Sequence, residues 1–406
     1  MREMKDSGVA WLGDIDSRFD IKAIGNLFTI KKDIIGREPD QVLSITQRGI
    51  KIKDTTSNEG QNAASYAHYQ IVNVGDFAMN HMDLLTGWVD ISRYEGVTSP
   101  DYRVFTLTDN TQIPEYFLRV FQMYYSNRVF YAFGQGAANL GRWRLPRENF
   151  VKIAIPCPPV ELQRKIVDEI ATKVSKVDAL IANQQAQIEK LKQYKQSLIT
   201  EVVTKGLDPN ASMKDSGVEW IGMMPEHWQL IRFRFIADIT TGNSDTQDAN
   251  PDGAYPFYVR SPIVERSNDY TFEGPGILMA GDGAGAGRVF HLVDGQYAVH
   301  QRIYRFYNFR YVDKELLKYY LENLFSTVMD YGSAKTTVPS VRLPMIQNFQ
   351  VCVPPLAEQE KMVEIIRKHA SSIDKLIDIK EKKIEKLTDY KKSLIYEYVT
   401  GKKEVS

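Results

Sequence analysis

Two stretches of the chain, 156–205 and 353–406, carry apolar residues at every third or fourth position. This spacing is typical of α-helices that pair in a coiled coil, and no proline or glycine interrupts either run between its opening Pro-Pro pair and its terminal glycine. We predict two spacer helices of about 45 residues, each roughly 65 Å long. The apolar positions expected to form their contact are Ile170, Val177, Ile181, Ile188, Leu191, Ile366, Ile373, Ile377, Ile384 and Leu387.

The apolar stripe is interrupted once in each predicted helix, at Gln184 and at Lys380, which are equivalent positions. Antiparallel pairing brings the two interruptions nearly opposite each other, and a polar residue in a coiled-coil core commonly fixes the register. The alternative is that each helix packs on its own globular domain, with both polar residues facing water. We favour pairing.

Outside these helices the pattern changes to short alternating runs. Residues 25–52 and 72–108 alternate apolar and polar positions between turn signals and are predicted to form strands. Residues 114–133 open with proline and are amphipathic, which predicts a helix. The second half repeats this order, with strands in 231–309 and a helix over 313–331.

The chain also contains an internal repeat. Residues 4–13 recur as 213–222 and residues 189–199 recur as 385–395, whereas the segments between the matching ends scarcely resemble each other. Repeated terminal segments and divergent central segments suit a protein in which the repeated segments perform the same function twice and the central segments perform two different functions.

The predicted fold class is therefore α+β. We expect two small mixed α/β domains joined by two long antiparallel coiled-coil helices, in an internal pseudo-two-fold repeat. The four segments are a first domain at 1–155, a first spacer helix at 156–205, a second domain at 206–352 and a second spacer helix at 353–406.

Composition limits the class of protein. The only two cysteines, Cys157 and Cys352, argue against a disulfide framework or a cysteine-rich zinc site, and no apolar run of about 18 residues predicts a membrane span. The opening residues lack the apolar core of a signal peptide, so we expect a cytoplasmic protein without a membrane partner.

The formal net charge is zero, which is unusual for a protein that binds nucleic acid. Basic residues exceed acidic ones only in the helical segments, 9 to 6 in residues 151–205 and 12 to 10 in residues 351–406. Residues 1–150 hold 17 and 18, and residues 206–350 hold 13 and 17. If the domains bind nucleic acid, the contact therefore requires a local basic patch or the charge of a partner.

Several short motifs together resemble one protein family. Residues 214–222 are followed by Pro225-Glu226-His227-Trp228, and Pro158-Pro159 and Pro354-Pro355 each precede a glutamine, Gln163 or Gln359. This set resembles the specificity subunits of type I restriction–modification systems over the whole chain. In the first opening, residues 14–19 differ from the proline and tryptophan that the family often shows, so we expect this opening to pack differently.

The resemblance implies a non-catalytic DNA-sequence-specificity subunit. Each domain would be a target-recognition domain that reads one half of a bipartite site in double-stranded DNA, and the helices would set the gap between the halves. Two methyltransferase (modification) subunits would dock on the repeated parts and methylate adenine at N6. S-adenosylmethionine, and ATP where restriction subunits are present, would be bound only by those partners.

No catalytic or cofactor motif of the chain's own is predicted. The glycine-rich run 281–287 is followed by residues that read as a strand rather than a helix, which favours a tight hairpin or a DNA-facing loop over a phosphate loop. The Pro-Pro pairs lack the preceding Asn or Asp of an adenine methyltransferase, and the six histidines show no metal-ligand spacing. We expect no cofactor and no metal.

Candidate DNA contacts are polar and basic residues in loop-like segments, because such side chains reach base edges and phosphates. Trp143 is expected to be a core anchor rather than a base stacker. The candidates are Arg48, Lys51, Lys53, Asn80, Arg93, Gln135, Asn139, Arg142 and Arg144 in the first domain, and Arg260, Arg266, Asn268, Arg288, Lys335, Thr336 and Arg342 in the second.

A second class of function stays open at this point. A cytoplasmic coiled-coil scaffold whose two domains bind proteins would also show repeated helices and divergent middles. The neutral charge favours such a scaffold, whereas the basic excess on the helices and the arginines in glycine-rich loops favour DNA.

Overall fold

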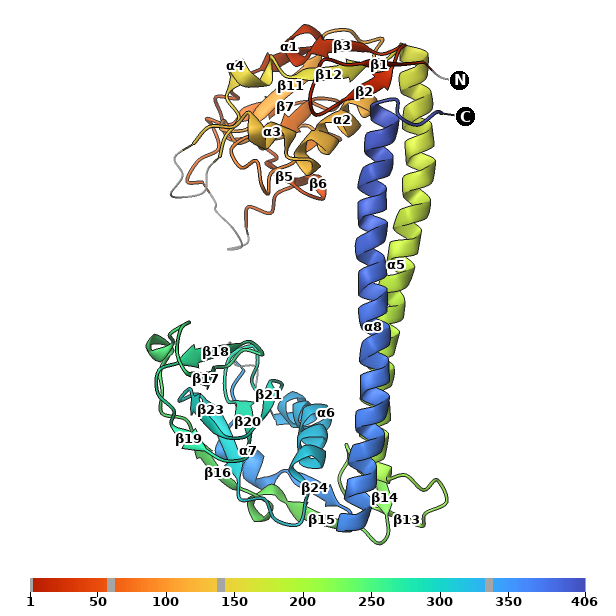
Figure 1. Cartoon of the computed structure of the whole chain (residues 1–406). Coiled ribbons are helices and arrows are strands. Elements are labelled where there is room, and N and C mark those ends of the chain that lie inside the picture. Colours follow the sequence, from red (N-terminus) through yellow and green to blue (C-terminus); the bar gives the residue numbers. More distant parts are fainter. Residues whose placement is uncertain (1–2, 57–62, 137–142, 333–338, 406) are drawn as a thin grey trace. The chain divides into compact units, whose positions relative to one another are not determined.

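The computed structural model describes residues 3–56, 63–136, 143–332 and 339–405 (Figure 1). Among the helices in these ranges, none is long and apolar enough to cross a membrane.

The chain forms two compact units. The first comprises residues 1–184 and 382–406, and the second comprises residues 185–381. Each unit therefore combines one globular part with a segment of each long helix.

The core of the first unit is a four-stranded antiparallel sheet covered by a helix, α2 (Pro114–Ser126). The ring of Phe121 in α2 lies 5.6 Å from that of Phe105 and 5.8 Å from that of Phe77, both on the sheet. Full burial of such an aromatic side chain stabilises a fold by about 1.5–3 kcal/mol. The strand order is β4 (Phe28–Lys31), β11 (Arg103–Leu107), β8 (Phe77–Met79) and β9 (Val89–Ile91).

Smaller strand pairs surround this core. The hairpin of β5 (Leu43–Thr46) and β6 (Gly49–Ile52) is connected to the pair of β7 (Gln70–Val72) and β10 (Gly96–Thr98) by a parallel bridge between Val42 and Val97. The remaining elements are the hairpin of β1 (Met4–Asp6) and β2 (Asp14–Asp16), the pair of β3 (Asp20–Ala23) and β12 (Ala154–Cys157), and the short helices α1 (Ile24–Leu27), α3 (Val129–Ala132) and α4 (Arg147–Phe150).

The helix predicted over 114–133 is interrupted. It consists of α2 and α3, separated at Arg128, whose φ of 57° lies in the left-handed region. A non-glycine residue in this conformation cannot continue a right-handed helix. The expectation of one continuous helix was wrong for this reason.

The second unit has the same topology. Its main sheet has the order β16 (Asp238–Thr241), β23 (Ile303–Tyr307), β20 (Gly276–Ala280) and β21 (Phe290–Val293), covered by α6 (Lys314–Gly332). Its second sheet has the order β18 (Val264–Ser267), β17 (Tyr255–Tyr258), β22 (Gln296–Val299) and β19 (Phe272–Glu273), with β17 and β22 parallel. It also holds the pairs β13 (Met213–Asp215) with β14 (Met223–Pro225) and β15 (Gln229–Arg232) with β24 (Gln350–Val353), the 3-10 turns η1 (Phe233–Phe235) and η2 (Thr246–Asp248), and α7 (Leu343–Asn348).

The correspondence is strand for strand, so the repeat extends through the middles whose sequences differ. The predicted helix over 313–331 is confirmed as α6. The mixed α/β class with two long helices is confirmed as well.

The long helices are α5 (Val160–Lys205) and α8 (Leu356–Val399), and their segments run antiparallel within each unit. In the first unit, Lys391 Nζ lies 2.7 Å from an oxygen of Asp178, and Tyr398 donates to Glu169. In the second unit, Lys195 Nζ lies 2.7 Å from Asp374. The ion pairs Lys391–Asp178 and Lys195–Asp374 are equivalent at the 196-residue offset of the repeat.

The predicted contact residues lie on the inner faces of these segments. Gln184 is 6% exposed, and Lys380 donates through Nζ to Gln187 Oε1, so neither polar interruption points freely into water. Ile170, Val177, Ile188, Ile366 and Ile373 are buried, and Ile181, Leu191, Ile377, Ile384 and Leu387 are partly buried.

A buried glutamine anchors the start of each long helix. Gln163 accepts a hydrogen bond from the backbone of Ile113 at 3.0 Å and donates to Pro158 O at 2.8 Å. Gln359 accepts from the backbone of Asp313 and donates to Pro354 O at 2.7 Å. The Pro-Pro motif and its glutamine thus fix the long helix to the segment that begins α2 or α6.

The two opening segments pack on the ends of the long helices. Trp228 lies against Gly206 and donates to Glu358 Oε2 at 3.1 Å, whereas Phe19 lies against Gly401 and has no polar group to donate. Asp16 instead pairs with Arg18 at 2.7 Å. The first opening therefore occupies the same place as the second but makes different polar contacts.

Candidate nucleic-acid interface

In each unit, three segments that are far apart in sequence meet at one edge of the main sheet. They are a hairpin turn outside the main sheet, the loop that follows the third strand of the main sheet, and a strand-like segment that follows the covering helix. In the first unit these are the β5–β6 turn, residues 80–88, and residues 135 and 144.

Hydrogen bonds join the three segments of the first unit. Gln47 Nε2 in the hairpin turn donates to Thr86 O at 3.3 Å, and Leu145 N donates to His81 O at 2.9 Å. Gln135 and Arg144 form a reciprocal backbone bridge at 2.8 and 3.0 Å, so their exposed side chains lie next to each other on one face.

Most of the basic candidates of the first unit are exposed. Arg48 lies at the hairpin turn and Lys51 lies on β6. Lys53 follows β6 and is half-buried, and its backbone N–H donates a hydrogen bond to Val42 O. Arg93 follows β9 at the opposite end of the sheet, because β8 leads into the 80–88 loop and β9 leads away from it.

The candidate Asn80 and the expected core anchor Trp143 both make structural contacts. The carbonyl of Asn80 accepts the hydroxyl of Tyr125, and its side chain caps Met82 N at 3.2 Å. Trp143 donates to Tyr131 O at 2.7 Å and stacks on that ring, as expected of a core anchor. Asn139 and Arg142 lie outside the described residues.

Two titratable side chains lie beneath this edge: Arg103, which sequence reasoning missed, and His81. Arg103 is 5% exposed and donates to Leu145 O, and burial lowers the pKa of its guanidinium to about 10. Burial, together with the nearby Arg103 and Arg144, lowers the pKa of His81 to about 3, so this imidazole is neutral at physiological pH. Their proximity could not be inferred from sequence, because β8 and β11 pair only in the folded sheet.

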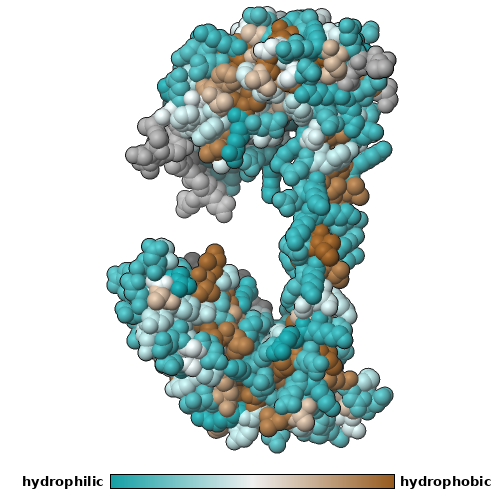
Figure 2. Space-filling view, viewed as in Figure 1, coloured by the Kyte–Doolittle hydropathy of each residue, from teal (hydrophilic) through white to brown (hydrophobic). Residues whose placement is uncertain are grey.

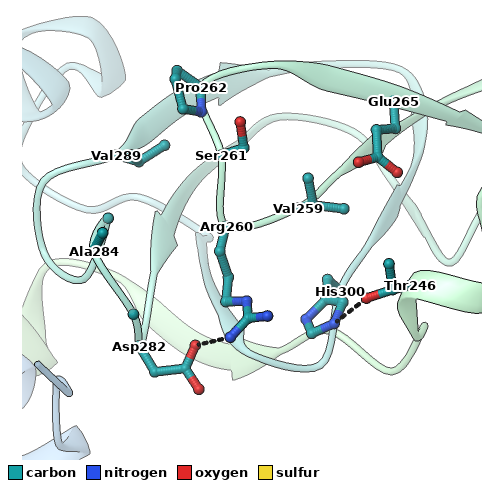
Figure 3. A pocket seen from close by; sticks show the side chains of 12 residues that line it. Thr246, Val259, Arg260, Ser261, Pro262, Glu265, Asp282, Ala284, Val289 and His300 are labelled. Atoms are coloured by element: carbon teal, nitrogen blue, oxygen red, sulfur yellow. Dashed lines mark hydrogen bonds and ion pairs between the residues drawn. The ribbon is translucent and has the colours of Figure 1, made fainter. Parts of the chain in front are cut away.

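The second unit builds the same edge from different residues. Its hairpin turn carries Arg260, its loop is 281–289, and Pro339 and Val341 follow the covering helix. Gly283 N donates to Pro339 O at 3.0 Å and Val341 N to Gly281 O at 2.8 Å. Arg260 Nη1 donates to Asp282 Oδ1 at 3.0 Å, which joins the turn to the loop as Gln47 does in the first unit (Figure 3).

The glycine-rich run is the hairpin loop between antiparallel β20 and β21, as predicted, and opens no helix. A side chain at Gly285 would place its Cβ 2.6 Å from the carbonyl oxygen of Arg260 and 2.9 Å from Val289 Cγ2. Glycine is therefore required there by the close approach of the loop to the hairpin turn.

A cavity of about 670 Å³ lies between this loop and the hairpin turn. Asp282 lines this cavity. One of its carboxylate oxygens accepts a hydrogen bond from Arg260, and the other lies 3.7 Å from the Nε of Arg302. His300 also lines the cavity, accepts the backbone N–H of Arg302 through Nδ1, and lies 3.4 Å from Thr246 Oγ1 (Figure 3). Burial, with a contribution from Arg260, lowers the pKa of His300.

The other candidates of the second unit divide into two groups. Arg288 and Arg342 are exposed near the edge. Arg266 instead donates to Gly253 O at 2.6 Å and Ala254 O at 2.8 Å, and Asn268 accepts from Asn250, so both hold the turn beside β18. Lys335 and Thr336 lie outside the described residues.

Asp282, His300 and Arg302 are the residues of this edge that sequence reasoning missed. Asp282 is visible in the sequence as an aspartate within a glycine run. Its two partners, Arg260 and Arg302, lie in the turns between β17 and β18 and between β22 and β23. No local periodicity predicts that these segments meet.

Comparison with models of known protein families gives a match that lies mostly in the second unit. Residues 225–389 match the model of the type I restriction modification DNA specificity domain. The resemblance to type I specificity subunits that the motifs predict is confirmed. Because the first unit has the same strand order, it is a second domain of the same construction.

Individual relatives extend the similarity. Over 280 residues the chain is 28% identical to the type I restriction enzyme MjaVIII specificity subunit of Methanocaldococcus jannaschii, a match that takes in 63% of this chain and 63% of that relative. It is 24% identical over 408 residues to the MjaX specificity subunit of the same organism, covering 94% of this chain and 91% of that one.

The fold is similar to that of a solved structure from work on complex assembly and conformational transition of the type I R-M system. The TM-score is 0.69 at 14% identity, and the match covers 95% of this chain and 99% of that chain. At this identity the likeness is one of fold.

Proposed function

We propose that this chain is the DNA-sequence-specificity subunit of a type I restriction–modification complex. Each unit reads one half of a bipartite site in double-stranded DNA, and the paired helices set the gap between the halves. The chain is non-catalytic. Adenine N6 methylation, with S-adenosylmethionine, belongs to two methyltransferase subunits, and any ATP-driven cleavage belongs to restriction subunits.

The observation that carries this proposal is the three-segment edge found in both units. A common backbone framework presents Gln47, Arg48, Gln135 and Arg144 in the first unit and a different set around Arg260 in the second. A protein that reads two different half-sites needs such a framework with exchangeable side chains, because base edges are distinguished by donor and acceptor pattern.

The long helices supply a surface for the methyltransferase partners. The surface in Figure 2 is largely hydrophilic, with hydrophobic patches along these helices. Leu180 and Tyr390 are 48% and 51% exposed in the first unit, and their repeat equivalents Leu376 and Tyr194 are 47% and 58% exposed in the second. Exposed apolar side chains at repeated positions suit two copies of one partner that dock in the same way.

Exchange of one reading domain tests the proposal. Residues 20–150 are replaced by the corresponding domain of a related specificity subunit of different target, and the methylated adenines of a host that carries the methyltransferase subunit are sequenced. We expect one half of the methylated motif to change and the other half and the gap to stay. The reciprocal exchange in the second unit is the matched control.

Two outcomes would overturn the proposal. If both halves of the motif change together, the units do not read independently. If methylation does not depend on this chain at all, the alternative of a coiled-coil scaffold without DNA recognition is favoured.

A further inference from the structure

We propose that the second unit reads a guanine in the major groove through Arg260, which Asp282 holds in position. This inference rests on the proposed function and names one base of the half-site. It also gives a role to the glycine-rich run 281–287, which is not a phosphate loop.

Asp282 is fixed by the fold before any ligand arrives. Its backbone is bridged to Ser340, and the hydrogen bonds of Gly281 N to Arg302 O, at 2.9 Å, and of Gly283 N to Pro339 O hold the loop on both sides. The Asp282 side chain is 21% exposed, against 47% for Arg260 and 64% for Arg302. The carboxylate is therefore a partly buried anchor, and the two guanidinium groups are its outward-facing partners.

The contact leaves one edge of Arg260 available. Among the described residues, Asp282 Oδ1 is the only hydrogen-bond partner of this guanidinium, and it engages Nη1. The Nε and Nη2 groups can then donate together to O6 and N7 of guanine, the base that presents two adjacent acceptors in the major groove. An anchored arginine also loses less conformational entropy on binding than a free one.

The cavity beside Arg260 suits this reading. Its lining includes Glu265 as well as Asp282, so carboxylates oppose the approach of a phosphate as the sole ligand. His300 is held by the backbone of Arg302 and, with its pKa lowered by burial, adds no charge of its own. A base edge, which offers both acceptors and an amino donor from the paired cytosine, matches a wall of mixed charge.

The test is a binding selection from duplex DNA with a randomised centre. The full chain is used together with its methyltransferase subunit, and the base preference at each position is measured for the wild type, Arg260→Ala, Arg260→Lys and Asp282→Asn. Arg266→Lys is the matched control, because Arg266 belongs to the same unit but bonds only backbone carbonyls among the described residues.

We expect the wild type to select a two-part motif with a guanine in one half. Both Arg260 variants should lose the preference for that guanine by about 5- to 150-fold and keep the other positions. Lysine preserves the ion pair with Asp282 but not the planar fork, so a merely structural arginine would be rescued by Arg260→Lys and a guanine reader would not. Asp282→Asn should weaken the same preference, and Arg266→Lys should leave it unchanged.

Failure of the inference is distinguishable from failure of the proposed function. If the wild type enriches no sequence, the proposed function is wrong. If the wild type enriches a motif, three results for Arg260→Lys overturn the guanine assignment alone. They are retention of every base preference, loss of the preference at an A·T base pair, and uniformly weaker binding to all sequences. The last result would indicate a phosphate contact.

Discussion

Replacement of Gln163 by leucine should destabilise the first unit severely. The Gln163 side chain is fully buried and makes hydrogen bonds to Ile113 N, Pro158 O and the Gln112 side chain. Leucine has a similar volume but leaves the first two backbone groups without their partner. Each buried unsatisfied group costs about 1–3 kcal/mol, so the loss should be about 2–6 kcal/mol.

Thermal unfolding measures this loss. For a domain of about 150–250 residues, 1 kcal/mol corresponds to about 2–4 °C, so the transition of the first unit should fall by about 4–24 °C. Hydrogen exchange at Ile113 N–H should accelerate in parallel, because that amide loses its acceptor. Gln193→Leu, on an exposed position of the same helix, is the control. A midpoint for Gln163→Leu within 1–2 °C of this control, about the effect of a surface change, would refute the reasoning.

Four further outcomes are expected. As the pH falls from 6 to 4, the free energy of unfolding of the wild type, measured in urea, should decrease by up to about 1.4 kcal/mol more per pH unit than that of His81→Gln. The reason is that His81 in the folded protein, with its pKa of about 3, takes up its proton at lower pH than it does in the unfolded chain. Equal slopes for the two proteins would contradict this. Lys195→Ala should cost under about 1 kcal/mol, since its pair with Asp374 is exposed; a larger loss in the same assay would show a stronger pair. Insertion of four residues after Gln184 and four after Lys380 lengthens both helices by about 6 Å, and methylome sequencing should show a longer gap between unchanged half-sites; an unchanged gap would mean that the helices do not set it. Finally, the neutral chain alone should bind DNA weakly in titrations at physiological salt and tightly only with a methyltransferase subunit; tight specific binding without it would count against this.

Sequence periodicity predicted the long elements well. The apolar stripe gave α5 and α8, because a helix of more than 40 residues accumulates many repeats of one local pattern. The break at Arg128 was not predictable in the same way, since nothing about an arginine indicates a positive φ before the fold imposes it.

The candidate site was predicted only in part. Arg48 and Arg260 were chosen separately from loop-like composition, and the structure places them on equivalent hairpin turns of the two units. Their partners could not be predicted, because the approach of Asp282 to Arg260 depends on pairing between strands that are distant in sequence. Arg266 was chosen on the same grounds as Arg260, yet its side chain is engaged by backbone carbonyls.

The glycine at the end of α8 has a consequence for the connectivity of the polypeptide. Gly401 and Gly206 both have a positive φ, 67° and 77°, and each lies against the aromatic residue of an opening segment, Phe19 or Trp228. After α5 the chain runs through residues 207–212 into the opening segment that packs on Gly206, whereas the opening segment that packs on Gly401 is distant in sequence. A permutant in which a linker joins the segment after Gly401 to the segment before Met4, and whose chain is cut within 207–212, should therefore retain the strand pairs and helix contacts of both units. The order of the two units along the polypeptide is in this sense interchangeable.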